Sequence, residues 1–332
     1  MQFIKVNELD KSVVEELGLS SFLMLSSYYN EYYKEKFSEE SFVILDQGIA
    51  QVIVFCSVLD NQVTLPDGAC KINFLKNLSG KIQKKIIKSI LLYLSEIAER
   101  KSCKNIVIKD VLNDDSSLSV LGQELFNQKF YTRLTFEMEV GHEDFSPQSF
   151  YTKIRDRYKS RINWGKKNLR IVTVNKDELC KETFQDFKSF HKKISGRQTR
   201  SNETWESQYK MIQAGFGEAL LAYYEEKLVS ASLFIDVYRT SLYFTGVYER
   251  ELFQHGISHY PVFEGICRSF KRGNTNLFSL GYFDTNIQDP KWYNTQFFKK
   301  GFARNLKPVI FWLKEKPSGD FFEKGFVLGS EE

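Results

Sequence analysis

The chain has 332 residues and a mass of 38.9 kDa, which favours two domains over one. Hydrophobic residues make up 42% of the chain and charged residues 27%. This balance is typical of a soluble globular protein and excludes a disordered chain. Aromatic residues make up 15%, which fits either sheets packed against helices or the walls of a binding cleft.

The first residues and the cysteines bear on the compartment. The opening MQFIKVNELDKS has no basic region followed by an apolar stretch, so we expect no cleaved signal peptide. The most apolar stretch, SFVILDQGIAQVIVFCSVL, contains Asp46, Gln47, Gly48 and Gln51, which makes it a poor membrane span and a good hairpin. Five cysteines without a close pair argue against a disulfide framework. We therefore expect a reducing compartment, the cytoplasm.

The first half of the chain predicts strands followed by alternating helices and strands. FVILD and AQVIVFCSVL flank Gln47-Gly48 and indicate two adjacent strands. LSGKIQKKIIKSILLYLSEIAERKS has an isoleucine or leucine every three or four residues, which predicts an amphipathic helix. Further along, NIVIKD indicates a strand, SVLGQELFNQKF a helix and YTRLTFEMEV a strand.

The second half repeats this order after a helical connection. FYTKIRDRYKSRINWGKKNL, CKETFQDFKSFHKKIS and NETWESQYKMIQAG predict three helices, the first of them basic. EALLAYYEEKLVSASLFIDVYRTSLYFTGVY then predicts three antiparallel strands. ISHYPVFEGICRSFKRG predicts a helix that ends at Gly273, NLFSLG a strand, DPKWYNTQFFKKGF a helix and NLKPVIFWLKE a strand.

The repeated order favours an internal duplication of a mixed α/β unit, with chance similarity of ordinary α/β patterning as the alternative. We predict two domains, at 1–145 and 146–332, each with a mixed sheet flanked by helices. The second domain includes a basic linker helix over 150–170, within a helical insertion near 146–215.

Charge is distributed unevenly between the halves. Residues 1–145 carry 16 basic and 21 acidic side chains, and residues 146–332 carry 30 basic and 21 acidic ones. Eight basic residues and one acid lie between Lys153 and Arg170, and five basic residues and no acid between Lys291 and Lys307. These stretches indicate a polyanionic ligand such as a nucleotide pyrophosphate, coenzyme A or RNA, or otherwise two solvated helix faces.

Several segments of the second half carry a resemblance to a known family. The run Phe297-Phe298-Lys299-Lys300-Gly301-Phe302, followed by a strand, resembles the closing motif of GNAT-type acyltransferases. With KSRINWGKKNL, HGISHYPVFEGICRSFKRG and NLFSLGYFD, the chain resembles the FemABX family and FemAB-like proteins over about 150–315. The resemblance implies tandem GNAT-like domains; the first half matches only by its plan.

The resemblance also implies an activity, which is acyl transfer to an amino group to form an amide. The implied donor is an aminoacyl-tRNA or an acyl-coenzyme A. The implied acceptor is an amino sugar or a peptidoglycan-type cell-envelope precursor, such as a nucleotide-linked amino sugar. No covalent enzyme intermediate is expected, because the amine attacks the carbonyl directly while protein groups stabilise the oxyanion.

Candidate donor-binding residues follow the three-stranded segment. A coenzyme A loop of the form Arg/Gln-x-x-Gly-x-Gly/Ala would cradle a pyrophosphate at a helix start. The matching stretch here keeps one glycine and a small serine, and it equally suits a plain glycine turn. The predicted donor-binding or phosphate-binding residues are Gln254, Gly256, Ser258, Lys300 and Arg304.

The candidate catalytic residues are Lys299, Asp284 and Tyr282. The resemblance places Lys299 near the acyl carbonyl, where a cation would stabilise the oxyanion. Asp284 follows a predicted strand and could accept a proton from the amine, while Tyr282 could donate one to the leaving group. The structural alternatives are a solvated helix-end lysine, a turn-capping aspartate and a packed tyrosine.

Arginine suits phosphate or carboxylate recognition, so the predicted acceptor-binding residues are Arg161, Arg197, Arg200 and Trp205. Each of these alone also suits an ordinary surface position. No metal site is predicted, since His255 and His259 have no third ligand at a recognisable spacing. A rival of another class remains open, in which the protein keeps the double fold but binds nucleic acid or a glycan without catalysis.

Overall fold

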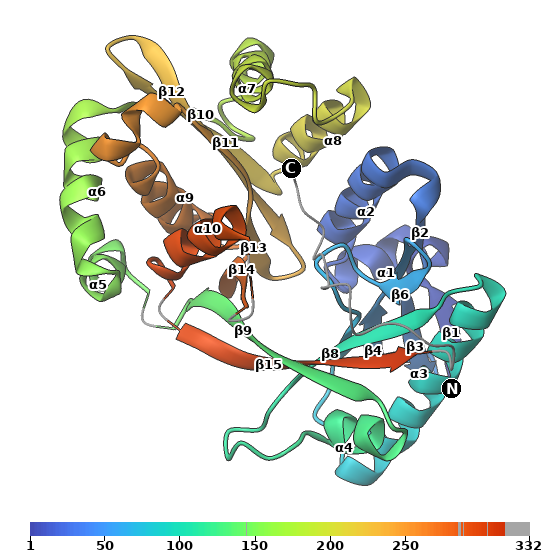
Figure 1. The fold of residues 1–332 in the computed structure, drawn as a ribbon. Coiled ribbons are helices and arrows are strands. Elements are labelled where there is room, and N and C mark those ends of the chain that lie inside the picture. The colour runs from blue at the N-terminus through green and yellow to red at the C-terminus, as the bar shows by residue number, and fades with distance from the viewer. Residues whose placement is uncertain (144, 285–286, 288, 304, 316–332) are drawn as a thin grey trace. The chain divides into compact units, whose positions relative to one another are not determined.

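The structure is a computed structural model, and it describes residues 1–143, 145–284, 287, 289–303 and 305–315. Its contacts form two compact units (Figure 1). Unit 1 comprises Met1–Leu17, Tyr33–Thr135 and the chain from Pro308, and unit 2 comprises Gly18–Tyr32 and Phe136–Lys307. Strands β9 (Tyr131–Gly141) and β15 (Asn305–Glu315) both pass from one unit into the other.

Unit 1 contains a four-stranded sheet, five consecutive strands of a second sheet and one long helix. One sheet has the order β1-β3-β4-β7, and the strands β15, β8, β6, β5 and β2 follow one another in the second. The strands are β1 (Gln2–Lys5), β2 (Phe37–Glu39), β3 (Phe42–Asp46), β4 (Ile49–Phe55), β5 (Ser57–Leu59), β6 (Gln62–Thr64), β7 (Lys71–Phe74) and β8 (Asn105–Val111). The helices are η1 (Val6–Glu8), α1 (Lys11–Glu16), η2 (Lys34–Lys36), α3 (Gly80–Arg100) and α4 (Val120–Asn127).

The periodicity of the first half predicts α3 and the hairpin correctly. Ile86, Ile90 and Leu94 lie on one face of α3 and are buried in the core of unit 1, where an apolar stripe belongs. Strands β3 and β4 pair antiparallel, and Gln47 and Gly48 between them have φ of 51° and 77°.

Unit 2 is built on one sheet, in which the strands follow the order β10-β11-β12-β13-β14-β9. Its strands besides β9 are β10 (Arg170–Val174), β11 (Gly217–Tyr224), β12 (Lys227–Val237), β13 (Thr240–Tyr248) and β14 (Leu277–Phe283). Strands β10 to β13 pair antiparallel, as expected for the three predicted strands, whereas β13 and β14 are parallel.

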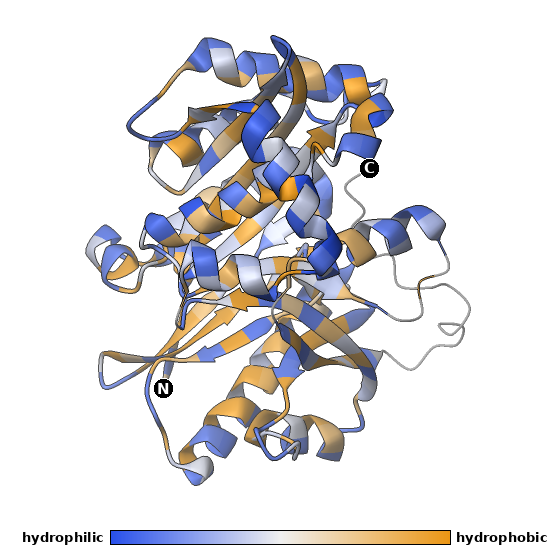
Figure 2. Ribbon diagram, turned by 90° about the vertical axis from the view of Figure 1, so that its left-hand side faces the viewer, coloured by the Kyte–Doolittle hydropathy of each residue, from blue (hydrophilic) through white to orange (hydrophobic). Residues whose placement is uncertain are grey.

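Helices cover both faces of this sheet (Figure 1). They are α2 (Ser20–Tyr33), α5 (Pro147–Lys153), α6 (Asp156–Asn168), α7 (Lys181–Ser195), α8 (Asn202–Gln213), η3 (Arg250–His255), α9 (His259–Lys271) and α10 (Pro290–Lys300). Helices α5, α6, α9 and α10 share one core, whose buried residues include Phe150, Tyr158 and Phe263. Helices α2, α7 and α8 share another, which includes Phe187 and Trp205. Figure 2 shows the apolar residues concentrated in the strands and on one side of the helices.

The last strand of each half pairs outside its own half. The part of β9 in unit 2 pairs antiparallel with β14, and the part of β15 in unit 1 pairs antiparallel with β8, from Val309 opposite Val111 to Glu315 opposite Asn105. Helix α2 likewise belongs by its contacts to unit 2. The two units defined by contacts therefore have other boundaries than the predicted repeats at 1–145 and 146–332. That the chain arose by duplication of these two repeats stays a prediction.

The predicted basic helix over 150–170 is in fact two helices. Ile154 and Arg155 are extended, with ψ of 163° and 128°, and they separate α5 from α6. The N–H of Arg155 donates to the carbonyl of Gly301 at 3.0 Å instead of to a carbonyl of its own helix. A long-range hydrogen bond thus breaks a helix that local periodicity would continue.

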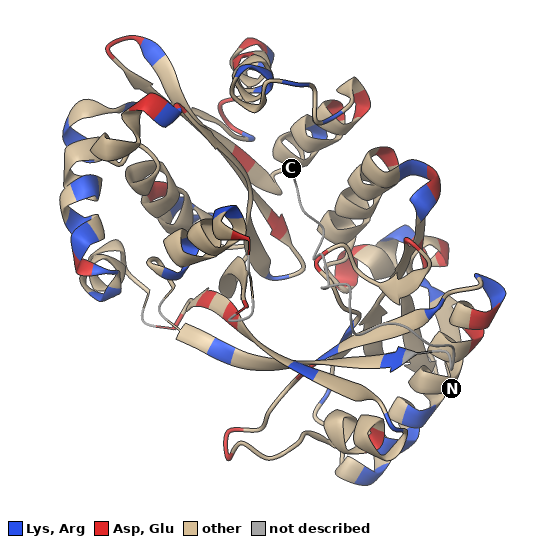
Figure 3. Cartoon of the chain, viewed as in Figure 1, with Lys and Arg blue, Asp and Glu red and all other residues tan. Residues whose placement is uncertain are grey.

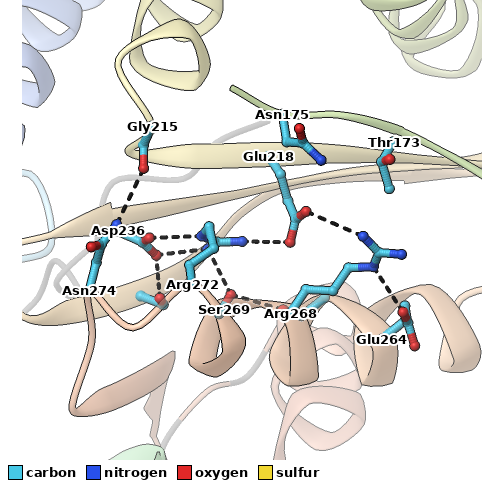
Figure 4. Close-up of polar contacts among 12 residues, drawn as sticks. Thr173, Asn175, Gly215, Glu218, Asp236, Glu264, Arg268, Ser269, Arg272 and Asn274 are labelled. Atoms are coloured by element: carbon cyan, nitrogen blue, oxygen red, sulfur yellow. Dashed lines mark hydrogen bonds and ion pairs between the residues drawn. The ribbon is translucent and has the colours of Figure 1, made fainter. Parts of the chain in front are cut away.

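A network of ion pairs fixes the C-terminal end of α9 to the sheet of unit 2 (Figure 4). Arg272 donates to both carboxylate oxygens of Asp236, at 2.9 and 2.8 Å, and also to Glu218. Arg268 lies 3.8 Å from Glu218. Both carboxylates are buried, and a buried negative charge needs a positive partner. The two arginines provide it.

Over the described residues the protein is of the mixed α/β class. One order of elements occurs twice: an antiparallel region is followed by a helix, a strand, a second helix and a second strand. Among the described helices, none is both long enough and apolar enough to cross a membrane. All five cysteines are free thiols.

Candidate active site

Strands β13 and β14 of unit 2 diverge after a short parallel contact. Their ladder pairs Thr240–Leu242 with Leu277–Ser279, while β13 continues to Tyr248 and β14 to Phe283. Both strands are irregular just beyond this point. Phe244 is an extra residue of β13 opposite β12, and the register of β14 against β9 shifts between Ser279 and Tyr282. Bulges of this kind re-aim side chains and often accompany active sites.

A group of hydroxyl side chains lies where β13 leaves β14. Tyr243 is the first residue beyond the ladder, and its hydroxyl is hydrogen-bonded to that of Tyr248. The hydroxyl of Tyr248 lies 3.1 Å from Ser232 Oγ on β12. Burial raises the pKa of both phenols, that of Tyr243 to well above its usual value. The two phenols are therefore neutral hydrogen-bond donors at neutral pH.

Helix α10 brings Lys299 to this place. Its Nζ lies 5.4 Å from the centre of the Tyr243 ring, within cation–π range. Lys300, the next residue, lies 4.3 Å from the ring of Phe283, the last residue of β14. The sequence places both lysines in the last turn of α10, where cations are favoured, and the structure sets that turn beside the diverging strands.

Asp284 follows β14 and is held against α10. It is 4% exposed, and its backbone N–H donates to Gln296 Oε1 at 2.9 Å. Tyr282, two residues earlier, is half-buried and lies opposite Glu137 of β9. The structure thus places Tyr282 on β14, Asp284 directly after β14 and Lys299 on α10, the helix that holds the backbone of Asp284.

The glycine loop before α9 contacts the basic helix α6. Gly256 has a φ of +69°, and a Cβ at this position would lie 2.7–2.8 Å from three side-chain carbons of Arg161. Gln254 is exposed in η3, and Ser258 precedes the first turn of α9. Arg161, predicted to bind the acceptor, thus stands at the predicted donor loop.

His259 joins the three helices of this region. Its Nδ1 lies 3.2 Å from the carbonyl of Gly256, and its ring packs against Tyr158 of α6 and Phe298 of α10 at 4.4 and 5.1 Å. Its Nε2 has no hydrogen-bond partner among the described residues. Burial, and then the positive charge of Arg161, lower its pKa to about 4. The imidazole is therefore neutral near pH 7 and acts in packing.

The two basic stretches of the sequence meet at Phe297 of α10. The guanidinium of Arg155 lies 4.1 Å from the centre of that ring, and the guanidinium of Arg157 lies 5.4 Å from it. Tyr158 donates from its hydroxyl to the carbonyl of Phe298 at 3.1 Å. Figure 3 shows the basic residues distributed along α6. Arg304 lies outside the described residues.

Two of the other predicted acceptor-binding residues lie on the opposite face of the sheet. Arg200 and Trp205 are each 4% exposed. Arg200 donates to Thr245 of β13 and to Tyr28 of α2, both at 3.3 Å, and lies 2.8 Å from His191 Nε2. These contacts support a structural role; Arg197 nearby is exposed. Acceptor binding by these residues stays a prediction.

Sequence reasoning missed Tyr243, Tyr248 and Ser232. The signal was the pair of tyrosines on either side of Phe244-Thr245-Gly246-Val247. It becomes informative only when β13 is known to leave β14 at Leu242. Among the described residues, no group of three or more His, Cys, Asp or Glu side chains could hold a metal ion.

Comparison with known proteins shows the fold. No family model and no curated protein sequence matches the chain. Among solved structures, FemX covers 93% of this chain and 97% of its own at 14% identity, with a TM-score of 0.64. A tandem GNAT protein from the clavulanic acid biosynthesis pathway covers 96% and 99%, at 11% identity and a TM-score of 0.54. L-PGS from Bacillus licheniformis covers 91% and 89%, at 11% identity and a TM-score of 0.53.

The chain therefore has the tandem GNAT fold of FemX and its structural relatives, as the closing motif predicts. At this level of identity, the likeness concerns the fold of the whole chain. The reaction that the protein catalyses can be inferred only from the side chains of this chain and their positions.

Proposed function

We propose that this protein is an acyltransferase that forms an amide on an amino group, with the reaction taking place where β13 and β14 diverge. The observation that carries the proposal is the position of Lys299 beside Tyr243, at the point where the parallel ladder ends. A cation held there is suited to stabilise the oxyanion of a tetrahedral intermediate. The shared fold with FemX and the tandem GNAT protein supports the same reaction class.

Asp284 and Lys299 have complementary roles in this proposal. The amine attacks the acyl carbonyl, its proton passes to the carboxylate of Asp284, and Lys299 faces the negative charge that develops on oxygen. Gln296 holds the backbone of Asp284 at 2.9 Å, so that α10 positions both groups. The fold holds both side chains in position before substrate binds. Such preorganised groups stabilise the charge of the transition state without having to move during the reaction.

The donor carries phosphate in either of its proposed forms, acyl-coenzyme A or aminoacyl-tRNA. Arg157 and Arg161 are exposed on α6, and Arg161 adjoins the loop before the thirteen-residue helix α9. Helix starts and arginine side chains both favour phosphate. Gly256, Ser258, Gln254, Lys300 and Arg304 remain the proposed donor-binding residues, and no metal is part of the proposal.

The acceptor is an amino sugar or a peptidoglycan-type envelope precursor, for example one linked to a nucleotide. This part follows from the FemABX resemblance, and it places the reaction in the cytoplasm, where such precursors and both donors would meet. Arg161 and Arg197 are the exposed members of the four candidate acceptor contacts.

One observation favours a rival, a nucleic-acid-binding or glycan-binding protein that keeps the double fold without catalysis. The side chain of Arg161 lies against Gly256, so the loop offers less bare backbone to a pyrophosphate than a loop with several glycines would. A binder would retain affinity for a polyanion and show no transfer.

A thermal-shift screen followed by a transfer assay separates these functions. Coenzyme A, tRNA and nucleotide sugars are each titrated, and a true ligand raises the melting temperature with concentration. The matching labelled acyl donor is then mixed with a panel of amino sugars and amino-sugar nucleotides. Stabilisation with amide formation supports the transferase, and stabilisation without any transfer supports the binder. No stabilisation by any of the three would count against both.

A further inference from the structure

The bulge in β13 changes which side of the sheet its residues face. Side chains of a regular strand alternate between the two faces, so Tyr243 and Tyr248 would face opposite sides if β13 were regular. Phe244 is the extra residue opposite β12, and it shifts this alternation by one position. As a result both phenols lie on the side of α6 and α9, where their hydroxyls are hydrogen-bonded to each other.

The two consecutive residues of the bulge face the other side of the sheet, toward α2, α7 and α8. The ring of Phe244 packs edge-on against that of Tyr28 in α2, with 5.1 Å between ring centres. The hydroxyl of Thr245 accepts a hydrogen bond from Arg200 at 3.3 Å. Tyr28 and Arg200 are both buried, so the bulge is supported from inside the protein.

Arg200 connects the partners of both bulge residues. Its Nε donates to the Tyr28 hydroxyl at 3.3 Å, while its Nη2 donates to Thr245. Its Nη1 lies 2.8 Å from Nε2 of His191 on α7. Burial, and then the charge of Arg200, lower the pKa of His191 to about 4, so the neutral ring accepts this hydrogen bond at neutral pH. One planar guanidinium thus joins α2 and α7 to the bulge.

The surroundings of Tyr243 depend on the bulge being kept. The ladder with β14 sets the register of β13 up to Leu242. If the strand lost its bulge by slipping one residue beyond this point, every later side chain would turn to the opposite face. Tyr248 would leave the side of Tyr243, whose hydroxyl would lose this partner. Because Lys299 Nζ lies 5.4 Å from the centre of the Tyr243 ring, the bulge matters where the reaction is proposed.

We propose that Arg200 and Tyr28 are positioning residues that hold the bulge of β13 from the opposite face of the sheet and thereby keep Tyr243 beside Lys299. This inference rests on the proposed acyltransferase function. It gives Arg200 an effect on the rate of the reaction, in place of the contact with the acceptor that the sequence suggests. Neither positioning residue touches the reacting groups.

Steady-state kinetics separate positioning from acceptor binding. Thr245→Val keeps the shape of the side chain and removes the acceptor of the Arg200 hydrogen bond. We expect it to lower kcat by about 10-fold or more, since small misplacements of catalytic groups are costly, and to leave the KM for the acceptor unchanged. Arg200→Met should lower kcat further, and Arg200→Lys, which keeps a donor, should recover part of the rate. A raised KM with an unchanged kcat would overturn the proposal in favour of acceptor binding.

A double-mutant cycle tests whether the effect passes through Lys299. Thr245→Val is made both in the wild type and in the Lys299→Ala background. If the bulge acts by keeping Tyr243 beside Lys299, the substitution should cost a much smaller factor of the remaining rate in that background. A merely structural contact would lower both rates by the same factor, and this result would overturn the proposal.

Tyrosine spectra test the geometry without any turnover. The protein is labelled with carbon-13 at the ζ carbon of tyrosine, and the NMR signals of Tyr243 and Tyr248 are assigned from their phenylalanine variants. Thr245→Val should shift both signals, because the environment of both phenols depends on the bulge. Signals that stay unchanged in this variant would show that the Arg200 hydrogen bond does not hold the bulge.

A matched pair of variants provides the control for the spectra. Tyr28→Phe removes the hydroxyl that Arg200 contacts and should shift the two signals, whereas Tyr209→Phe removes a hydroxyl from α8 in the same core and should leave them in place. Equal shifts in both variants would contradict a specific role of Tyr28. A wild type that transfers no acyl group would remove the proposed function and the effect on its rate, while the spectra would still show whether these residues hold the bulge.

Discussion

Arg161 lies directly against Gly256, so that three of its side-chain carbons occupy the space that a Cβ on the glycine would need. The contact joins the basic helix α6 to the loop that precedes α9. The backbone of Gly256 is left-handed, with φ of +69°. Two independent constraints, one of conformation and one of space, therefore require glycine at this position.

Gly256→Ala should cost more stability than backbone strain alone, because Arg161 must also move. Gly273 provides the matched control, since its φ is +77° and nothing lies within 4 Å of an added Cβ. We expect Gly273→Ala to lower the free energy of unfolding by about 1 kcal/mol, and Gly256→Ala to lower it further. Urea denaturation of both variants measures this difference. Equal losses would show that the contact with Arg161 contributes nothing.

Removal of Arg272 should destabilise unit 2 strongly, because it leaves Glu218 and Asp236 buried without their main partner. Breaking such a pair costs about 3–5 kcal/mol. We therefore expect Arg272→Met to lower the free energy of unfolding by that amount, and Arg268→Met, which removes a partly exposed arginine, to cost much less. Chemical denaturation of the two variants side by side provides the measurement.

The pH dependence of Arg272→Met follows from the pKa of Glu218, which burial raises in the folded protein. A carboxyl with a raised pKa binds its proton more tightly when folded, so its contribution to stability is complete below its unfolded pKa and is lost as pH rises. The deficit of Arg272→Met should therefore shrink toward acidic pH. A deficit that is constant from pH 5 to pH 8 would contradict this account of the network.

Acid should destabilise unit 2 through His259, whose pKa is lowered from 6.5 to about 4 by burial and by Arg161. The unfolded chain binds a proton more readily than the folded one, so this contribution is present above pH 6.5 and is lost as pH falls toward 4. His259→Phe keeps an aromatic ring and should flatten the slope of stability against pH by about 1.4 kcal/mol per unit in that window. Urea midpoints measured from pH 4 to 7 would show it; a slope equal to that of the wild type would exclude the role.

Much of the fold could be predicted because it rests on local patterns. The apolar stripe of α3, the turns at Gln47-Gly48 and Glu225-Glu226, and the Asp289 cap of α10 are all visible in short windows of sequence. Helices α1 and α2 and the short strands β1, β2, β6, β7 and β10 were not predicted. β10 is an edge strand of five residues with little alternation between apolar and polar side chains.

The rest depends on contacts between distant segments. The break between α5 and α6 comes from the Arg155 bond to Gly301, and β15 pairs with β8 from the other end of the chain. The same holds for the site. Lys299 and Gly256 could be suggested from motifs. Tyr243 becomes a candidate site residue only when the parallel ladder is known to end at Leu242. Arg200, a surface arginine in the sequence reading, lies in the core because His191, Tyr28 and Thr245 surround it.

The central claim is that amide formation depends on Lys299, and the rate of transfer tests it most directly. The measurement compares the single-turnover rate of wild type, Lys299→Ala and the exposed control Lys210→Ala, with the labelled donor and acceptor that the wild type accepts. Lys299 lies in the last turn of α10 and is half-buried, so the melting temperature of each variant is measured beside its rate to separate lost chemistry from lost stability. The account predicts that Lys299→Ala is slower by about 10²-fold or more, with Lys210→Ala at the wild-type rate. A Lys299→Ala variant that is folded and transfers as fast as the wild type would contradict it.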